Sequence, residues 1–256
     1  MITLLLLRKF KVFLIELGQF AALFLGITKF LPRIYKDRKL IIDQMVHIGV
    51  NSLVLVGIIG LFTGAVSSWQ VAYQIKGMIS YSYLGTATPK AIIIELGPVL
   101  TAIVLAGRVG ASISAELGTM KVTEQIDALE SMGISPIRYL AMPKVVATIT
   151  MMPILVIYAS AVAIFGSYFV AAVFLDVPGA VYLNGFRKTF EMKDVFAAII
   201  KALFFGASIS SIGCFVGFQT KGGAEGVGLS TIKSFVICAA MILILDAVLW
   251  NFLIAA

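Results

Sequence analysis

Apolar and polar residues occur along this chain in long blocks, and five apolar blocks are long enough to cross a membrane. A helix needs about 20 apolar residues to span roughly 30 Å of hydrocarbon. The five blocks are Ile48–Tyr73, Ala91–Ser112, Val145–Leu175, Val195–Phe218 and Phe235–Ala256. The third is longer than one span requires and contains Pro153, so a kink, a tilt or an extension beyond the bilayer is expected. The pattern predicts an all-α membrane protein with five transmembrane helices.

The first 44 residues differ from the rest of the chain. Val12–Phe30 is apolar, but Glu16 and Gln19 interrupt it, and basic residues flank it on both sides. A transmembrane helix, the alternative, would put one basic cluster on the wrong side of the membrane. A helix lying in the interface would leave both clusters against anionic headgroups. We therefore predict an N-terminal interfacial amphipathic helix in residues 1–44 and a five-span domain in residues 45–256.

A polar segment with its own helix signals separates the second and third spans. Within residues 119–133, Thr123 is a suitable N-cap, and Glu124 and Asp127 follow in the first turn, where the helix dipole favours negative charge. Gly133 suits a left-handed residue after the helix, and Pro136 prevents its continuation. These signals predict a short helix outside the membrane. The alternative is a solvated loop helix that only caps two spans.

This helix is expected to be amphipathic. At 100° per residue, its positions divide into a mainly apolar arc and an acidic arc. The first arc holds Gln125, Ile126, Ala128, Leu129 and Met132, and the second holds Glu124, Asp127, Glu130 and Ser131. The two faces would suit a partner outside the membrane.

Composition and charge agree with a membrane protein of defined orientation. The chain has 60% hydrophobic and 13% charged residues, with a mean hydropathy of +1.04, which excludes an ordinary soluble fold. Of its 20 Lys and Arg residues, 14 fall on the N-terminal side of a five-span topology. This asymmetry predicts a cytoplasmic N-terminus and a periplasmic C-terminus. The net charge of +7 then indicates orientation and attraction to lipid surfaces, and no nucleic-acid binding is expected.

The sequence contains no catalytic or nucleotide-binding motif. The phosphate loop G-x-x-x-x-G-K-[ST] is absent, and the glycine-rich stretch 222–228 is interpreted as a flexible loop between spans. His47 is the only histidine, and Cys214 and Cys238 lie in apolar spans as packing residues, so no metal site or catalytic pair is predicted. We expect no enzyme activity and no cofactor in this chain. Energy-driven work would require a separate nucleotide-binding protein.

Four ionisable residues fall inside the predicted spans, where charge is costly and usually functional. Glu95 opens the second span, and Arg108 lies near its other end. Lys201 lies one or two turns into the fourth span, from which it could extend to the membrane surface. Asp246 is midway along the fifth span and should face the bundle, a partner cation or a water-filled cavity. An ion pair between the fourth and fifth spans is one arrangement.

Two glycine pairs indicate close helix packing. Gly60 and Gly64, and likewise Gly213 and Gly217, have the G-x-x-x-G spacing that lets helix backbones approach in lipid. They predict a tight bundle and, less directly, a dimer.

A longer, ordered set of motifs resembles the MlaE/YrbE permease family. These motifs are Glu95-Leu96-Gly97-Pro98-Val99-Leu100-Thr101, Ala106-Gly107-Arg108-Val109-Gly110-Ala111, Ala115-Glu116-Leu117-Gly118-Thr119-Met120, Thr123-Glu124-Gln125-Ile126-Asp127-Ala128-Leu129 and Pro136. The resemblance is strongest over residues 95–144 and extends over 45–255. The family often has a basic residue before the Glu-Leu-Gly-Pro motif, whereas this chain has Ile94.

The resemblance implies the membrane subunit of an MCE-associated ABC transporter that moves phospholipids across the bacterial envelope and maintains lipid asymmetry. Two copies would form a cavity open to the outside in the inner membrane. An ABC ATPase subunit would bind ATP and Mg and dock on the helix near residues 119–133, the coupling helix. A periplasmic MCE-domain protein would continue the lipid path, and family complexes often include a STAS-domain protein. The coupling residues implied are Glu116, Thr123, Glu124, Asp127, Leu129 and Met132.

Three alternatives remain open at the level of sequence. The substrate of the same family fold could be a sterol or another hydrophobic lipid. A proton-coupled secondary transporter could use Asp246, although such carriers usually show more intramembrane acids and repeat symmetry. A structural membrane scaffold would not need an elaborated helix outside the bilayer.

Overall fold

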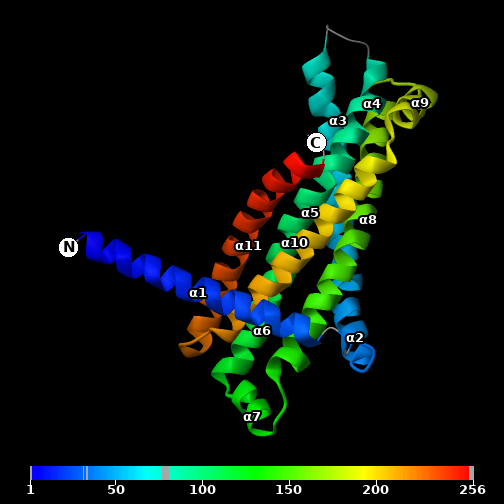
Figure 1. Cartoon of the computed structure of the whole chain (residues 1–256). Coiled ribbons are helices and arrows are strands. Elements are labelled where there is room, and N and C mark those ends of the chain that lie inside the picture. Colours follow the sequence, from blue (N-terminus) through cyan, green and yellow to red (C-terminus); the bar gives the residue numbers. More distant parts are fainter. Residues whose placement is uncertain (1, 31, 33, 77–80, 254–256) are drawn as a thin grey trace.

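The computed structural model describes residues 2–30, 32, 34–76 and 81–253, and within these ranges it contains helices and no strand (Figure 1). Five helical segments are long and apolar enough to cross a membrane. They are Arg38–Ile75, Leu84–Val122, Ile137–Phe174, Met192–Phe218 and Gly223–Leu253. The prediction of an all-α protein with five spans is confirmed, although several spans begin earlier in the chain than hydropathy alone suggested.

Each of the first three spans is built from shorter helical pieces. The first joins α2 (Arg38–Ile48), the 3-10 turn η2 (Val50–Ser52) and α3 (Leu53–Ile75). The second joins α4 (Leu84–Ala91), η4 (Ile92–Leu96), α5 (Gly97–Leu105), η5 (Ala106–Gly110) and α6 (Ala111–Val122). The third joins η6 (Ile137–Ala141) and α8 (Met142–Phe174), and Pro153 lies inside α8.

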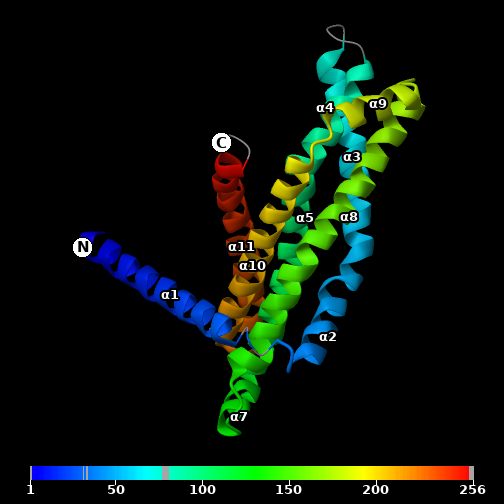
Figure 2. The same cartoon turned by 45° about the vertical axis from the view of Figure 1, so that its right-hand side comes forward.

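The remaining elements connect or complete the bundle. They are α1 (Ile2–Phe30), the 3-10 turn η3 (Tyr81–Tyr83), α7 (Gln125–Ser131), α9 (Gly179–Thr189), α10 (Met192–Phe218) and α11 (Gly223–Leu253). Helices α7 and α9 lie at opposite ends of the bundle (Figures 1 and 2), which we call the α7 end and the α9 end.

Helices α8 and α10 form the centre of the bundle. Helix α8 packs against α3 on one side and α10 on the other, and α10 also packs against α6 and α11. A Cβ atom added at Gly64 would overlap the Ala163 carbonyl, and one added at Gly166 would overlap that of Leu61, so α3 and α8 pack backbone to backbone. Gly213 lies close to the Gly110 carbonyl of η5, and Gly217 lies close to the Leu117 side chain of α6. The predicted tight packing at the G-x-x-x-G pairs is therefore found within a single chain.

Helix α1 lies across the α7 end and projects away from the bundle (Figures 1 and 2). Its Phe20 ring packs edge-on against Phe215 at 5.5 Å, and Gln219 donates a 2.7 Å hydrogen bond to Gln19. These contacts come from the part of α1 in which Leu23 and Ile27 are also buried. The interfacial placement of α1 stays a prediction, and the boundary drawn between residues 44 and 45 falls inside α2.

The segment after the second span differs from the prediction. Residues 119–132 do not form one helix with Thr123 as its N-cap, because α6 continues to Val122 and Thr123 is its C-cap. The Thr123 hydroxyl donates a 2.8 Å hydrogen bond to the Thr119 carbonyl, four residues earlier in the chain. Glu124 then takes a left-handed conformation (φ 60°), and α7 begins after it. Gly133 has the predicted positive φ, at 75°.

The glycine-rich stretch 222–228 was also interpreted incorrectly as a flexible loop. Only Gly222 and Gly223 adopt positive φ, and the residues from Gly223 onward form the first turns of α11. Glu225 lies in the first turn, where the helix dipole favours an acid. The glycines thus make a tight turn and then enter a long helix.

Candidate functional site

A buried ionic cluster joins three of the four charged residues predicted inside the spans. Lys201 of α10 is fully buried, and its Nζ lies 2.7 Å from Glu95 Oε2 and 2.7 Å from Asp246 Oδ1. The same ammonium lies 5.1 Å from the centre of the Trp250 ring, within the range of a cation–π contact. Lys201 therefore does not extend to the membrane surface. It links the second, fourth and fifth spans.

The backbone of the second span helps to form this cluster. Glu95 lies in η4, a π-helical turn, and such turns often mark functional sites. Pro98 has no N–H to donate to the Ile94 carbonyl four residues earlier, and Lys201 Nζ lies 3.4 Å from that carbonyl oxygen. The Gly-Pro motif thus leaves a backbone acceptor near the buried ammonium. Lys201 has three donors, and the structure supplies three acceptors.

The cluster is unevenly buried. The side chain of Lys201 is 0% exposed, that of Asp246 is 13% exposed and that of Glu95 is 36% exposed. With both acids ionised, two carboxylates face one ammonium and the formal charge is −1. Charged groups in hydrocarbon are stable only when they are paired, so the three residues depend on one another. Glu95 is the member through which another molecule can reach the cluster.

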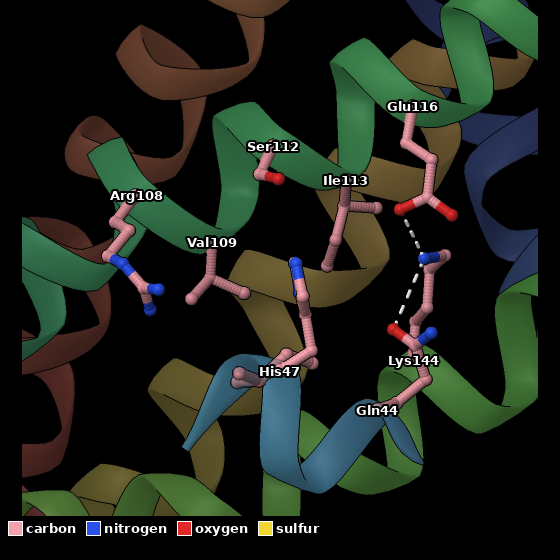
Figure 3. A pocket seen from close by; sticks show the side chains of 9 residues that line it. Gln44, His47, Arg108, Val109, Ser112, Ile113, Glu116 and Lys144 are labelled. Carbon is pink, nitrogen blue, oxygen red and sulfur yellow. Dashed lines mark hydrogen bonds and ion pairs between the residues drawn. The ribbon is translucent and has the colours of Figure 1, made fainter. Parts of the chain in front are cut away.

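Arg108 belongs to a second site, which Figure 3 shows from close by. It lies in the half of the second span that leads into α6 and α7. It lies in η5, another π-helical turn, and its Nη1 donates to the Ser52 hydroxyl where α3 begins. It lines a pocket of about 170 Å³, which we call the α7-end pocket. The polar side chains of this pocket are Gln44, His47, Arg108, Ser112, Glu116 and Lys144, with apolar side chains between them.

An ion pair between a buried lysine and an exposed glutamate closes one side of the α7-end pocket. Lys144 of α8 is 2% exposed, and its Nζ lies 2.6 Å from Glu116 Oε2 and 3.2 Å from Gln44 Oε1. Figure 3 shows this ammonium between the two oxygen-bearing side chains. Glu116, which the family resemblance implied as a coupling residue, pairs with the buried Lys144 while its own side chain stays 46% exposed. Lys144 was not among the site residues predicted from the sequence, in which it stands just before a long apolar run.

Most residues of the apolar and acidic arcs predicted for the α7 region are exposed. Ile126 is buried and Leu129 packs against the core, whereas Met132 is 66% exposed. Glu124 and Asp127 are exposed, and Asp127 Oδ1 lies 2.7 Å from Lys121 Nζ. The apolar arc is thus divided, with one part holding α7 against the bundle and another open to a partner. Thr123, the remaining predicted coupling residue, is exposed at the turn before α7.

The fold defines a polytopic membrane protein with ionic groups held between its helices and an exposed helix at one end. Comparison with known proteins identifies its class further. The model of the family described as "Permease MlaE" matches residues 41–252. A probable ABC transporter permease protein of Rickettsia conorii is 40% identical over 205 residues, which cover 80% of this chain and 79% of that protein.

Relatives from other organisms show the same similarity to ABC transporter permeases. A probable ABC transporter permease protein of Synechocystis sp. is 38% identical over 200 residues, covering 78% of this chain and 76% of that protein. One from Pyropia yezoensis is 37% identical over 213 residues, covering 83% and 81%. The chain belongs to the MlaE permease family and is an ABC transporter permease. The family resemblance found in its motifs is confirmed.

Proposed function

We propose that this chain moves phospholipid across the bacterial cell envelope and thereby maintains lipid asymmetry. The observation that carries the proposal is the Glu95–Lys201–Asp246 cluster, which is polar, buried and reachable through the partly exposed Glu95. A lipid site needs a few polar contacts for the headgroup and apolar walls for the acyl chains. Large exposed apolar side chains along α3 and α11, such as Phe62, Trp69 and Phe235, supply such walls.

The transporter we propose contains two copies of this chain and two of an ABC ATPase. An ABC permease works with an ATPase. That subunit would bind ATP and Mg. The exposed face of α7, with Glu124, Asp127 and Met132, would dock on that subunit. A periplasmic MCE-domain protein would accept or deliver the lipid, and a STAS-domain protein would bind the ATPase. These partners follow from the family resemblance.

The proposed location is the bacterial inner membrane, with the N-terminus in the cytoplasm and the C-terminus in the periplasm. The 14-to-6 distribution of Lys and Arg supports this orientation. It puts the α7 end in the cytoplasm, where an ATPase subunit would be. It puts α9 and the end of α11 on the periplasmic side.

The test uses the complex purified through a tag on this chain. Mass spectrometry should find co-purified phospholipid and an ATPase in a 1:1 ratio with this chain. In vesicles, the complex should transfer fluorescent phosphatidylglycerol only when ATP and Mg are present. Retention and transfer of a sterol, with no phospholipid moved, would assign the other hydrophobic-lipid function. Transfer driven by a proton gradient without ATP would overturn the proposal.

A further inference from the structure

Arg108 is a charged residue inside a span, and no acid in the described part of the chain forms an ion pair with it. Its only hydrogen-bond partner there is the Ser52 hydroxyl, reached through Nη1. A guanidinium has five N–H donors, so most of them have no protein partner among these residues. Charge inside a membrane span usually has a partner or a function. The side chain is partly buried and lines the α7-end pocket.

The rest of the pocket favours an anion. Glu116 is its one acid, and the buried Lys144 ammonium neutralises it at 2.6 Å. The side-chain oxygen of Gln44 accepts a hydrogen bond from Lys144, so the amide nitrogen of Gln44 is left as a donor. Ser112 and His47 add a hydroxyl and an imidazole to the lining. With a neutral imidazole, the polar lining carries a formal charge of +1, from Arg108.

The pocket reaches from the hydrocarbon to the level of the lipid headgroups. Taking the middle of each span as the bilayer centre and a rise of about 1.5 Å per residue, Arg108 lies roughly 8 Å from the centre. On the same basis His47 lies roughly 14 Å away and Lys144 roughly 17 Å away. The hydrocarbon ends about 15 Å from the centre. The pocket therefore crosses the boundary between hydrocarbon and headgroups on the α7 side.

We propose that the α7-end pocket binds the phosphate group of a phospholipid from the leaflet on the α7 side, with Arg108 as its principal ligand. The proposal rests on the proposed function for its choice of lipid as the source of the phosphate. The volume of about 170 Å³ greatly exceeds the roughly 10–15 Å³ that one water needs, and it is too small for two acyl chains. The chains would therefore lie outside the pocket, in the bilayer. This site is separate from the Lys201 cluster.

The experiment measures binding to the purified complex by native mass spectrometry, so it does not depend on transport. The probes are dioctanoyl-phosphatidylglycerol, dioctanoylglycerol, which has no phosphate, and inorganic phosphate. Arg108→Gln removes the charge, and Ser112→Leu fills the pocket without changing charge. Lys221→Gln is the control, because Lys221 is exposed at the same end of the bundle. Thermal unfolding checks that each variant is folded.

The wild type and Lys221→Gln should bind phosphatidylglycerol equally and dioctanoylglycerol weakly. Arg108→Gln and Ser112→Leu should each weaken phosphatidylglycerol binding about tenfold or more, because a charge-assisted hydrogen bond or the space for the phosphate is lost. Unchanged binding in both variants would overturn the proposal. It would also be overturned if Arg108→Gln disrupted the dimer but left lipid binding intact. Binding of inorganic phosphate but not of the lipid would also overturn it. A complex that binds lipid here but transports none contradicts only the proposed function.

Discussion

Replacement of Lys201 by Met tests whether the buried ionic cluster holds the bundle together. The substitution keeps the length of the side chain but removes the ammonium that Glu95 and Asp246 share at 2.7 Å each. One charge pair about 4 Å apart is worth about 4 kcal/mol at an effective dielectric constant of 20. Removing one partner of a buried pair typically costs about 3–5 kcal/mol, since the other charge stays buried. Here two carboxylates lose their shared counter-ion, so we expect at least that loss.

The assay is thermal unfolding of the purified complex, followed by light scattering and tryptophan fluorescence. A loss of this size should lower Tm on the order of 10 °C, since each kcal/mol shifts Tm by about 2–4 °C in a chain of this length. Asp246→Asn should cost less, because Lys201 keeps Glu95 and an amide oxygen. Combining Lys201→Met with Glu95→Gln and Asp246→Asn should restore much of the stability by removing every unpaired charge.

The matched control is Lys233→Met, whose lysine is 52% exposed and should contribute within about 0.5 kcal/mol. The reasoning is refuted if Lys201→Met unfolds at the wild-type temperature, or if the triple variant is less stable than the single one. Transport measured on the same samples separates function from folding. A triple variant that is stable but inactive would show that the charges serve transport as well as packing.

Four further outcomes are expected. Asp246→Asn should impair transport or assembly more than Asp43→Asn, whose acid is exposed on α2, and equal transport rates would leave Asp246 without a functional role. Glu124→Lys combined with Asp127→Lys should weaken ATPase binding by about 1–3 kcal/mol, because the new charges oppose the α7 dipole and a basic partner surface. The control Glu225→Lys, at the same end of the bundle, should leave ATPase co-purification unchanged. Unchanged co-purification in the double variant would mean that α7 only caps two spans. Gly64→Ala should destabilise the bundle, because its Cβ overlaps the Ala163 carbonyl, while Gly228→Ala meets nothing within 4 Å and should be neutral in the same unfolding assay. A C-terminal phosphatase fusion should be active and a C-terminal fluorescent fusion dark; the reverse would indicate that α1 spans the membrane.

Several features of this protein follow from the sequence alone. The number of spans depends on apolar length, which is a local property, and the residues that the structure describes contain the predicted five. The positive φ of Gly133 and the close packing at Gly64 also follow from local rules, because glycine alone avoids the steric cost in both places. The cost of charge in hydrocarbon identified Glu95, Lys201 and Asp246 before any contact was known.

Only the tertiary structure decided which of these charges meet. Hydropathy does not define the rotation of each helix about its axis, so it could not show that Lys201 bridges two acids while Arg108 lies in another pocket. Nor could the sequence show that Lys144, at the start of a span, is buried in α8 and paired with Glu116. The cap signal at Thr123 failed for a related reason. The second span continues through α6 to Val122, and a helix that is already formed and packed overrides a local preference to begin a new one.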